Sequence, residues 1–168
     1  MRVYLPSTIP ALARVVAAGE LGPAPLTGFA VTPALIEWYA SGDTEELEYV
    51  ALTEAARGSL RMLAADRADG VQAAARRVVI AAEVPDETVK TGAELEERAR
   101  VRVLEPIPMR LVAAVHVDDA DALPDVEAAI AALPAADGGD DDAQFVVDGA
   151  EDHELLWYAT QEIPDLLS

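Results

Sequence analysis

The chain has 168 residues, 52% of them hydrophobic and 5% aromatic, and its formal net charge is −19 at pH 7. This length suits one domain that buries its own core, and the strong negative charge disfavours DNA, RNA and anionic membranes as partners. Cysteine is absent and there are only two histidines and one lysine, so most routes to nucleophilic catalysis and soft-metal binding lack their side chains.

The first half of the chain alternates short strands with helices. Arg2–Leu5 and Phe29–Val31 are short apolar runs typical of strands. Thr8, Thr32 and Asp43 have side chains that favour the N-cap position, and each precedes a segment with a helical pattern. The sequence therefore predicts three helices in this half, the longest of them running from Asp43 to about residue 65. No apolar run approaches the ~20 residues that span a bilayer, and the first residues do not resemble a signal peptide, so we expect a cytoplasmic location.

The second half begins with strand-like patterns. The expected strands are Arg77–Val84, Arg100–Leu104, Arg110–Val117, Gln144–Val147 and Leu155–Thr160, and Asp121–Leu133 is an alanine-rich helix. The short segment Glu105–Pro108 predicts that the strands on either side of it pair as an antiparallel hairpin. The acidic run at 135–143 has the composition of a mobile, solvated loop.

These elements predict a single α+β domain spanning residues 1–168. We expect a mixed or mainly antiparallel sheet with helices mostly on one face, and the order of elements leaves a ferredoxin-like arrangement open.

Three segments resemble a known family. They are MRVYLPSTIPALA at Met1–Ala13, LTGFAVTPALIEWYASGDTEELEYVAL at Leu26–Leu52, and the pair RRVVIAAEVPD and VRVLEPIPMRLVAAVHVDD at Arg76–Asp86 and Val101–Asp119. Together they are similar to an actinobacterial protein family of unknown function. The resemblance implies a bacterial cytoplasmic setting and carries no catalytic or binding residues.

The nearest approach to an active site is the end of the strand at residues 110–117. His116, Asp118 and Asp119 combine a base with carboxylates at a strand terminus, where sites in α/β proteins often lie. Such a group would suit a small hydrolase or isomerase using a divalent cation. The alternative is structural, in which Asp118 or Asp119 caps the next helix and His116 is a half-buried strand residue.

Six arginines fall between residues 76 and 110, which is unusual in so acidic a chain. Strand alternation places Arg100 and Arg102 on one face, and the expected hairpin adds Arg110 from the next strand. This face is a candidate for binding an acidic partner, while the alternative is that the arginines pair with the protein's own carboxylates.

Aromatic side chains form two clusters that are far apart in the sequence. Trp38 and Tyr39 belong to the first and Trp157 to the second, and they would line a pocket for a small apolar ligand if the clusters met. A shared core would explain them equally well. The acidic run lacks the ligand spacing of a calcium loop, so no metal and no cofactor is expected.

The leading hypothesis is a non-catalytic protein-binding or accessory module, with a protein partner or a second copy of the chain bound through the sheet. The hydrolase or isomerase and the apolar ligand binder are the alternatives.

Overall fold

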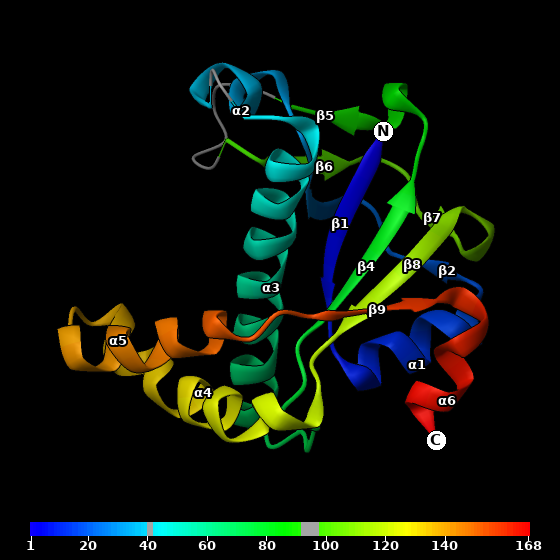
Figure 1. The fold of residues 1–168 in the computed structure, drawn as a ribbon. Helices are drawn as coiled ribbons and strands as arrows, with labels where there is room; N and C mark the ends of the chain where they lie inside the picture. Colours follow the sequence, from blue (N-terminus) through cyan, green and yellow to red (C-terminus); the bar gives the residue numbers. More distant parts are fainter. Residues whose placement is uncertain (40–41, 92–97) are drawn as a thin grey trace.

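Strand β1 (Arg2–Ser7) lies at the centre of a seven-stranded sheet in a computed structural model that describes residues 1–39, 42–91 and 98–168 (Figure 1). The order is β5-β6-β3-β1-β4-β8-β9, and every pair of neighbours is antiparallel. The other strands are β3 (Leu26–Phe29), β4 (Val78–Glu83), β5 (Val89–Lys90), β6 (Arg100–Val103), β8 (Val112–Val117) and β9 (Leu156–Ala159). The predicted α+β class with a mainly antiparallel sheet is confirmed.

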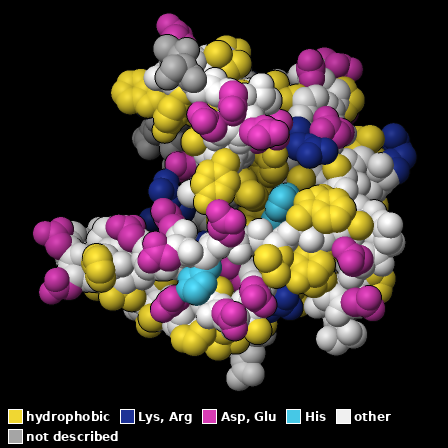
Figure 2. All heavy atoms as spheres, viewed as in Figure 1, with side chains coloured by type: hydrophobic (Ala, Val, Ile, Leu, Met, Phe, Trp, Pro, Cys, Tyr) yellow, Lys and Arg dark blue, Asp and Glu magenta, His cyan; other side chains and the backbone are white. Residues whose placement is uncertain are grey.

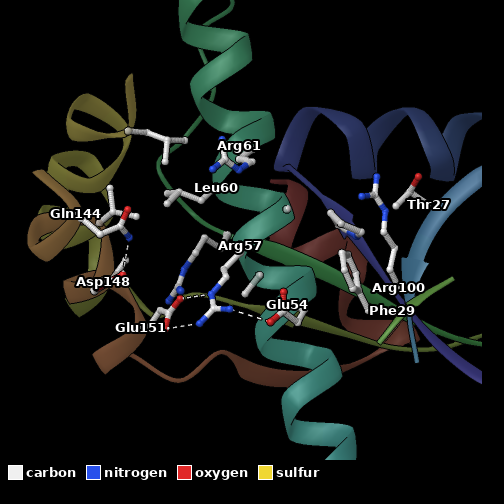
Figure 3. Close-up of a pocket in the computed structure, with 17 residues that line it drawn as sticks. Thr27, Phe29, Glu54, Arg57, Leu60, Arg61, Arg100, Gln144, Asp148 and Glu151 are labelled. Atoms are coloured by element: carbon white, nitrogen blue, oxygen red, sulfur yellow. Dashed lines mark hydrogen bonds and ion pairs between the residues drawn. The ribbon is translucent and has the colours of Figure 1, made fainter. Parts of the chain in front are cut away.

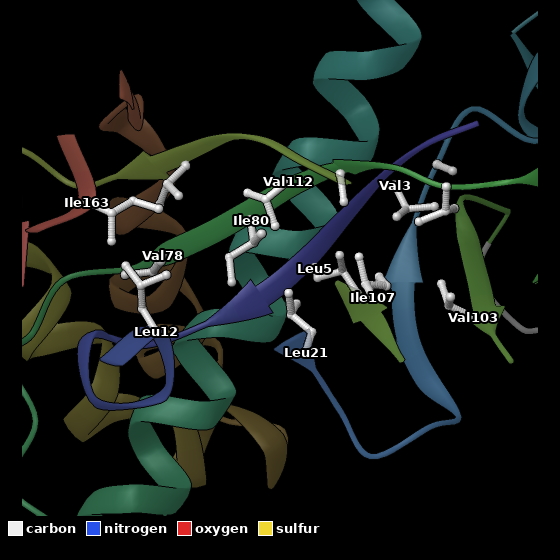
Figure 4. Packing of buried hydrophobic residues seen from close by; sticks show 14 of the residues in the cluster. Val3, Leu5, Leu12, Leu21, Val78, Ile80, Val103, Ile107, Val112 and Ile163 are labelled. Atoms are coloured by element: carbon white, nitrogen blue, oxygen red, sulfur yellow. The ribbon is translucent and has the colours of Figure 1, made fainter. Parts of the chain in front are cut away.

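One face of the sheet packs against the helix α1 (Ile9–Ala18) and the short C-terminal helix α6 (Ile163–Leu167). Alternate residues of the central strands point to this side, because side chains along a strand face opposite ways in turn. Figure 4 shows Val3, Leu5, Val78 and Ile80 from the sheet meeting Leu12 and Ile163 from the two helices, all of them buried.

The opposite face is covered by the 25-residue helix α3 (Thr44–Ala68) and by α2 (Pro33–Trp38). The first of these begins as predicted, with the Asp43 carboxylate accepting a hydrogen bond from the N–H of Glu46 at 2.8 Å. It lies very close to β1, since a Cβ atom on Gly58 would stand only 2.6 Å from Cγ of Pro6. The glycine is therefore the residue that permits this contact.

The helices α4 (Leu123–Asp137) and α5 (Asp141–Gly149) form an arm beside the C-terminal half of α3 (Figure 1). Leu60 and Leu63 of α3 pack on Val126 and Ile130 of α4 in a third apolar cluster. The larger helices thus lie on one side of the sheet, as expected. Because α1 and α6 cover the other side, the central strand β4 is buried on both faces.

The predicted hairpin between Arg100–Leu104 and Arg110–Val117 was wrong. Strands β6 and β8 are separated by β3, β1 and β4, and residues Met109–Leu111 form a 3₁₀ turn. The intervening Ile107–Pro108 is the strand β7, which pairs with β2 (Glu20–Leu21) in a small separate sheet. Ile107 is buried in the core, so the connection is held by packing and does not act as a tight turn.

Two further predictions fail in the acidic region. The segment at 135–143 is mostly helical, with only residues 138–140 between α4 and α5, and the expected strand at 144–147 lies within α5. Asp140 explains the start of α5, because its carboxylate accepts hydrogen bonds from the N–H groups of Asp142 and Ala143 at 3.0 and 3.1 Å.

The ferredoxin-like arrangement is present only in part. Helix α3 joins β3 to β4, which lie on either side of β1 and are both antiparallel to it, so these elements form one split βαβ unit. The helical connections from β1 to β3 and from β8 to β9 join neighbouring antiparallel strands instead, so they do not supply the second unit of a ferredoxin-like fold. None of the helices within the described ranges combines the length and apolar content needed to cross a membrane.

Candidate functional site

Asp118, the central member of the predicted catalytic group, is fully buried and bound to Arg77. The carboxylate accepts three hydrogen bonds, from the backbone N–H of Arg77 at 2.7 Å and from its Nε and Nη2 at 2.9 and 2.8 Å. The same guanidinium donates to the carbonyl of His153 at 3.0 Å. This bidentate pair joins the start of β4 to the end of β8, and the carboxylate has a structural partner on both oxygens.

The other two members have separate surroundings. Asp119 is exposed and accepts a hydrogen bond from the N–H of Ala120 at 2.7 Å, at the start of the 3₁₀ turn Ala120–Ala122 that leads into α4. His116 is a half-buried strand residue whose ring lies 6.2 Å from that of Tyr4. Burial lowers the pKa of His116, and the nearby positive charge of Arg2 lowers it further.

Carboxylates and histidines are dispersed in the described part of the chain. There, no group of three or more His, Cys, Asp or Glu side chains is placed to hold a metal ion. Asp137, from the run expected to be solvated, pairs instead with Arg61 of α3 through two hydrogen bonds of 2.9 and 3.0 Å, and this pairing lowers the pKa of the carboxyl group. His153 contacts Asp125 of α4 at 2.6 Å.

The three arginines of the predicted binding face are not brought together. Arg100 and Arg102 do share one face of β6, as the alternation of strand side chains predicts. Arg110 is exposed in the 3₁₀ turn before β8, on the other side of three intervening strands. The reason is the missing hairpin between β6 and β8.

The two aromatic clusters do not meet either. Trp38 stands at the end of α2, where its ring stacks on the guanidinium of Arg98 at 3.5 Å, close to the start of β6. Trp157 lies on β9, at the opposite edge of the sheet (Figure 1). Each tryptophan is 61% exposed, so neither belongs to a shared core.

The structure contains a hollow that the sequence did not reveal. It has a volume of about 610 Å³ and lies along α3, with β3 and β6 on one side and α5 on the other (Figure 3). Arg57 projects into it and pairs with Glu54 at 2.8 Å and with both oxygens of Glu151. The one available signal was Gly58, a helix-weakening residue in the middle of a long predicted helix.

A second surface surrounds the edge strand β9. Trp157 is in register with His116 of β8 and faces the same side of the sheet as α3. Figure 2 shows hydrophobic side chains gathered around the more central of two histidines, between α3 and β9. Tyr49 of α3, which is 50% exposed, and Leu156, which is 43% exposed, add to the apolar character of this part of the molecule.

These features define an α+β protein with an antiparallel sheet between two helical layers, a hollow along α3 and an exposed apolar edge strand at β9. A family model described as a family of unknown function (DUF6912) matches residues 1–167, and the chain belongs to this family. The predicted membership of an uncharacterised family is confirmed. No curated protein and no solved structure gave a match.

Proposed function

We propose that this protein is a non-catalytic protein-binding module that pairs with a second copy of itself through the edge strand β9. The observation that carries the proposal is an exposed, uncharged edge strand on which Trp157 has no hydrogen-bond partner outside the sheet among the described residues. The expected cytoplasmic, bacterial setting is part of the same proposal, and cell fractionation would test it.

The two edges of the sheet differ in how they discourage pairing. Strand β5 has two residues and carries Lys90, and both a short length and a lysine are common ways of protecting an edge. Strand β9 has four residues, Leu156–Ala159, with no charge and no proline. The Glu162 carboxylate occupies the N–H of Ala159 at one end of the strand, but the rest of this exposed apolar edge is a template for another strand.

Backbone groups on this edge are directed outward. The N–H of Ala159 donates to a carboxylate oxygen of Glu162 at 2.8 Å, so it points away from β8. Backbone groups of alternate residues point to the same side of a strand, hence those of Trp157 also face the open edge. Among the described residues, no hydrogen bond outside the sheet itself involves Trp157.

A second copy suits this edge because the pairing is self-complementary. Two β9 strands related by a twofold axis at Trp157 would run antiparallel, like every other pair in the sheet. The two Trp157 side chains would then lie side by side on one face, and Leu156 would oppose Tyr158 of the second copy on the other. Each contact would bury apolar surface that is exposed in the monomer.

The charge of the strip is compatible with this contact. A net charge of −19 makes two copies repel, but residues 155–161 are uncharged, so the strip itself brings no like charges together. Added salt screens the remaining repulsion. Dimerisation should therefore strengthen with salt, whereas docking of an acidic partner on the arginines would weaken.

The test is sedimentation velocity over a range of protein concentrations, at about 0.05 and about 0.5 M NaCl. Trp157→Lys should weaken association at least tenfold, because the apolar contact between the two rings is lost and two lysines would meet at the twofold axis. Trp38→Lys is the matched control, since that side chain is equally exposed at 61% but lies on α2, and it should have no effect. A monomer under all conditions, or equal loss in both variants, would refute the proposal. Association that Trp157→Lys leaves intact would show that another surface is used.

A further inference from the structure

The hollow along α3 gathers positive charge in a very acidic chain. Four of the twelve basic residues line it, against three of the thirty-one acidic ones. The four are Arg57, Arg61, Arg77 and Arg100. An enrichment of this kind in a concave surface indicates a preference for negative charge, provided that the arginines are not all neutralised by the protein itself.

Three of the four arginines are neutralised. Arg57 pairs with Glu54 and Glu151, Arg61 with Asp137, and Arg77 with Asp118. Arg100 differs from them. Among residues 1–39, 42–91 and 98–168, no hydrogen bond or ion pair involves its guanidinium, although the side chain is half-buried. A half-buried arginine without a carboxylate has lost part of its hydration with no charge in return, so a bound anion would stabilise it.

The surroundings of Arg100 are apolar and open to the hollow. Strand register places Arg100 opposite Phe29 of β3, and Figure 3 shows Arg100, Phe29 and Thr27 together on one side of α3. Gly58 adds to the available space, because a side chain there would approach Pro6 and the ring of Phe29. Leu60 of α3, with Leu133 and Val147 from the arm, extends the apolar lining.

The remaining charges limit what can bind. Asp148 of α5 lines the opposite side and accepts a hydrogen bond from Gln144 at 2.8 Å, so a second negative charge on a ligand would meet repulsion there. A single guanidinium suits a carboxylate, which it can hold with two parallel hydrogen bonds. A volume of about 610 Å³ lies in the usual range for small-molecule sites.

From these observations we infer that the hollow binds a small monocarboxylate with an apolar body, whose carboxylate pairs with Arg100 and whose body lies against Phe29 and the apolar side of α3. No residue of β9 lines this hollow, so the two proposed sites do not share a side chain.

Titration calorimetry of the full chain with octanoate tests the inference. Octanoate should bind saturably, Arg100→Gln should weaken it at least tenfold, and Arg102→Gln should leave it unchanged. Arg102 is the matched control because it lies on the same face of β6 but outside the hollow. Octanamide, which has the same body without the charge, and inorganic phosphate should each bind at least tenfold more weakly than octanoate.

A second variant protects the test against misfolding of Arg100→Gln. Thr27 is exposed, lines the hollow near Arg100 and is in register with Arg102. Thr27→Glu should therefore place a carboxylate in the mouth of the hollow and compete with octanoate, without disturbing the core. No binding of octanoate, equal binding by Arg100→Gln, or equal binding of octanamide or phosphate would overturn the inference. Trp157→Lys should bind octanoate like the wild type, so failure of the dimer proposal and failure of this one can be told apart.

Discussion

Replacing Asp118 with Asn should lower the stability of the protein more than neutralising an exposed carboxylate does. The amide has one acceptor oxygen in place of the two that receive hydrogen bonds of 2.7, 2.9 and 2.8 Å from Arg77. Arg77 is only 3% exposed, so its charge would remain buried without a counter-ion. Removing one partner of a buried ion pair costs about 3–5 kcal/mol. At roughly 2–4 °C per kcal/mol for a domain of this size, the melting temperature should fall by about 6–20 °C.

Urea denaturation followed by circular dichroism, together with a thermal melt, measures this loss. Asp137→Asn is the control, because it removes an ion pair of similar geometry, with Arg61, from a half-exposed position where solvent screens it, and the change should be much smaller. The double variant Arg77→Met/Asp118→Leu should be more stable than Asp118→Asn, since no buried charge remains. Equal stability of Asp118→Asn and the wild type would refute this reasoning, and Asp118 would again be a candidate for a catalytic role.

Two further predictions concern the packing of α3 and the protonation of His116. Gly58→Ala should lower the free energy of unfolding, because overpacking against Pro6 costs about 1–3 kcal/mol and outweighs the gain of about 1 kcal/mol from the higher helix propensity of alanine. Gly149→Ala is the control and should raise the free energy of unfolding slightly, since no atom lies within 4 Å of the added Cβ. Urea denaturation midpoints measure both changes, and a Gly58→Ala variant as stable as the wild type would contradict the close contact. Because burial and Arg2 lower the pKa of His116, the unfolded chain takes up this proton first as pH falls below about 6.5, so the wild type should lose more stability than His116→Gln between about pH 7.5 and 5.5. Equal losses in the two urea titrations would show that His116 titrates normally.

The candidate sites were predictable only in part. Alternation along β6 places Arg100 and Arg102 on one face, and this held because it depends on the strand alone. Arg110 was assigned to the same face through a hairpin that does not form. The other residues of the hollow, such as Arg57 and Glu151, are 94 positions apart in the chain, and no local pattern connects them.

Elements whose signals are local could be placed from the amino-acid pattern alone. Asp43 caps α3 through a hydrogen bond three residues away, and Thr8 and Thr32 do the same for α1 and α2. The run at Gln144–Val147 was misread because a short apolar stretch fits a strand or a helix, and the cap at Asp140 decided the outcome.

The order of the strands, the open edge at β9 and the partner of Asp118 depend instead on contacts between distant parts of the chain. The β4–β8 pair joins residues 30 to 39 positions apart, and the Arg77–Asp118 pair joins residues 41 positions apart. Such contacts depend on which apolar faces can be buried together, and this is settled by the packing of the whole sheet between its two helical layers, since neither hydrophobic period nor capping specifies which strand lies beside which.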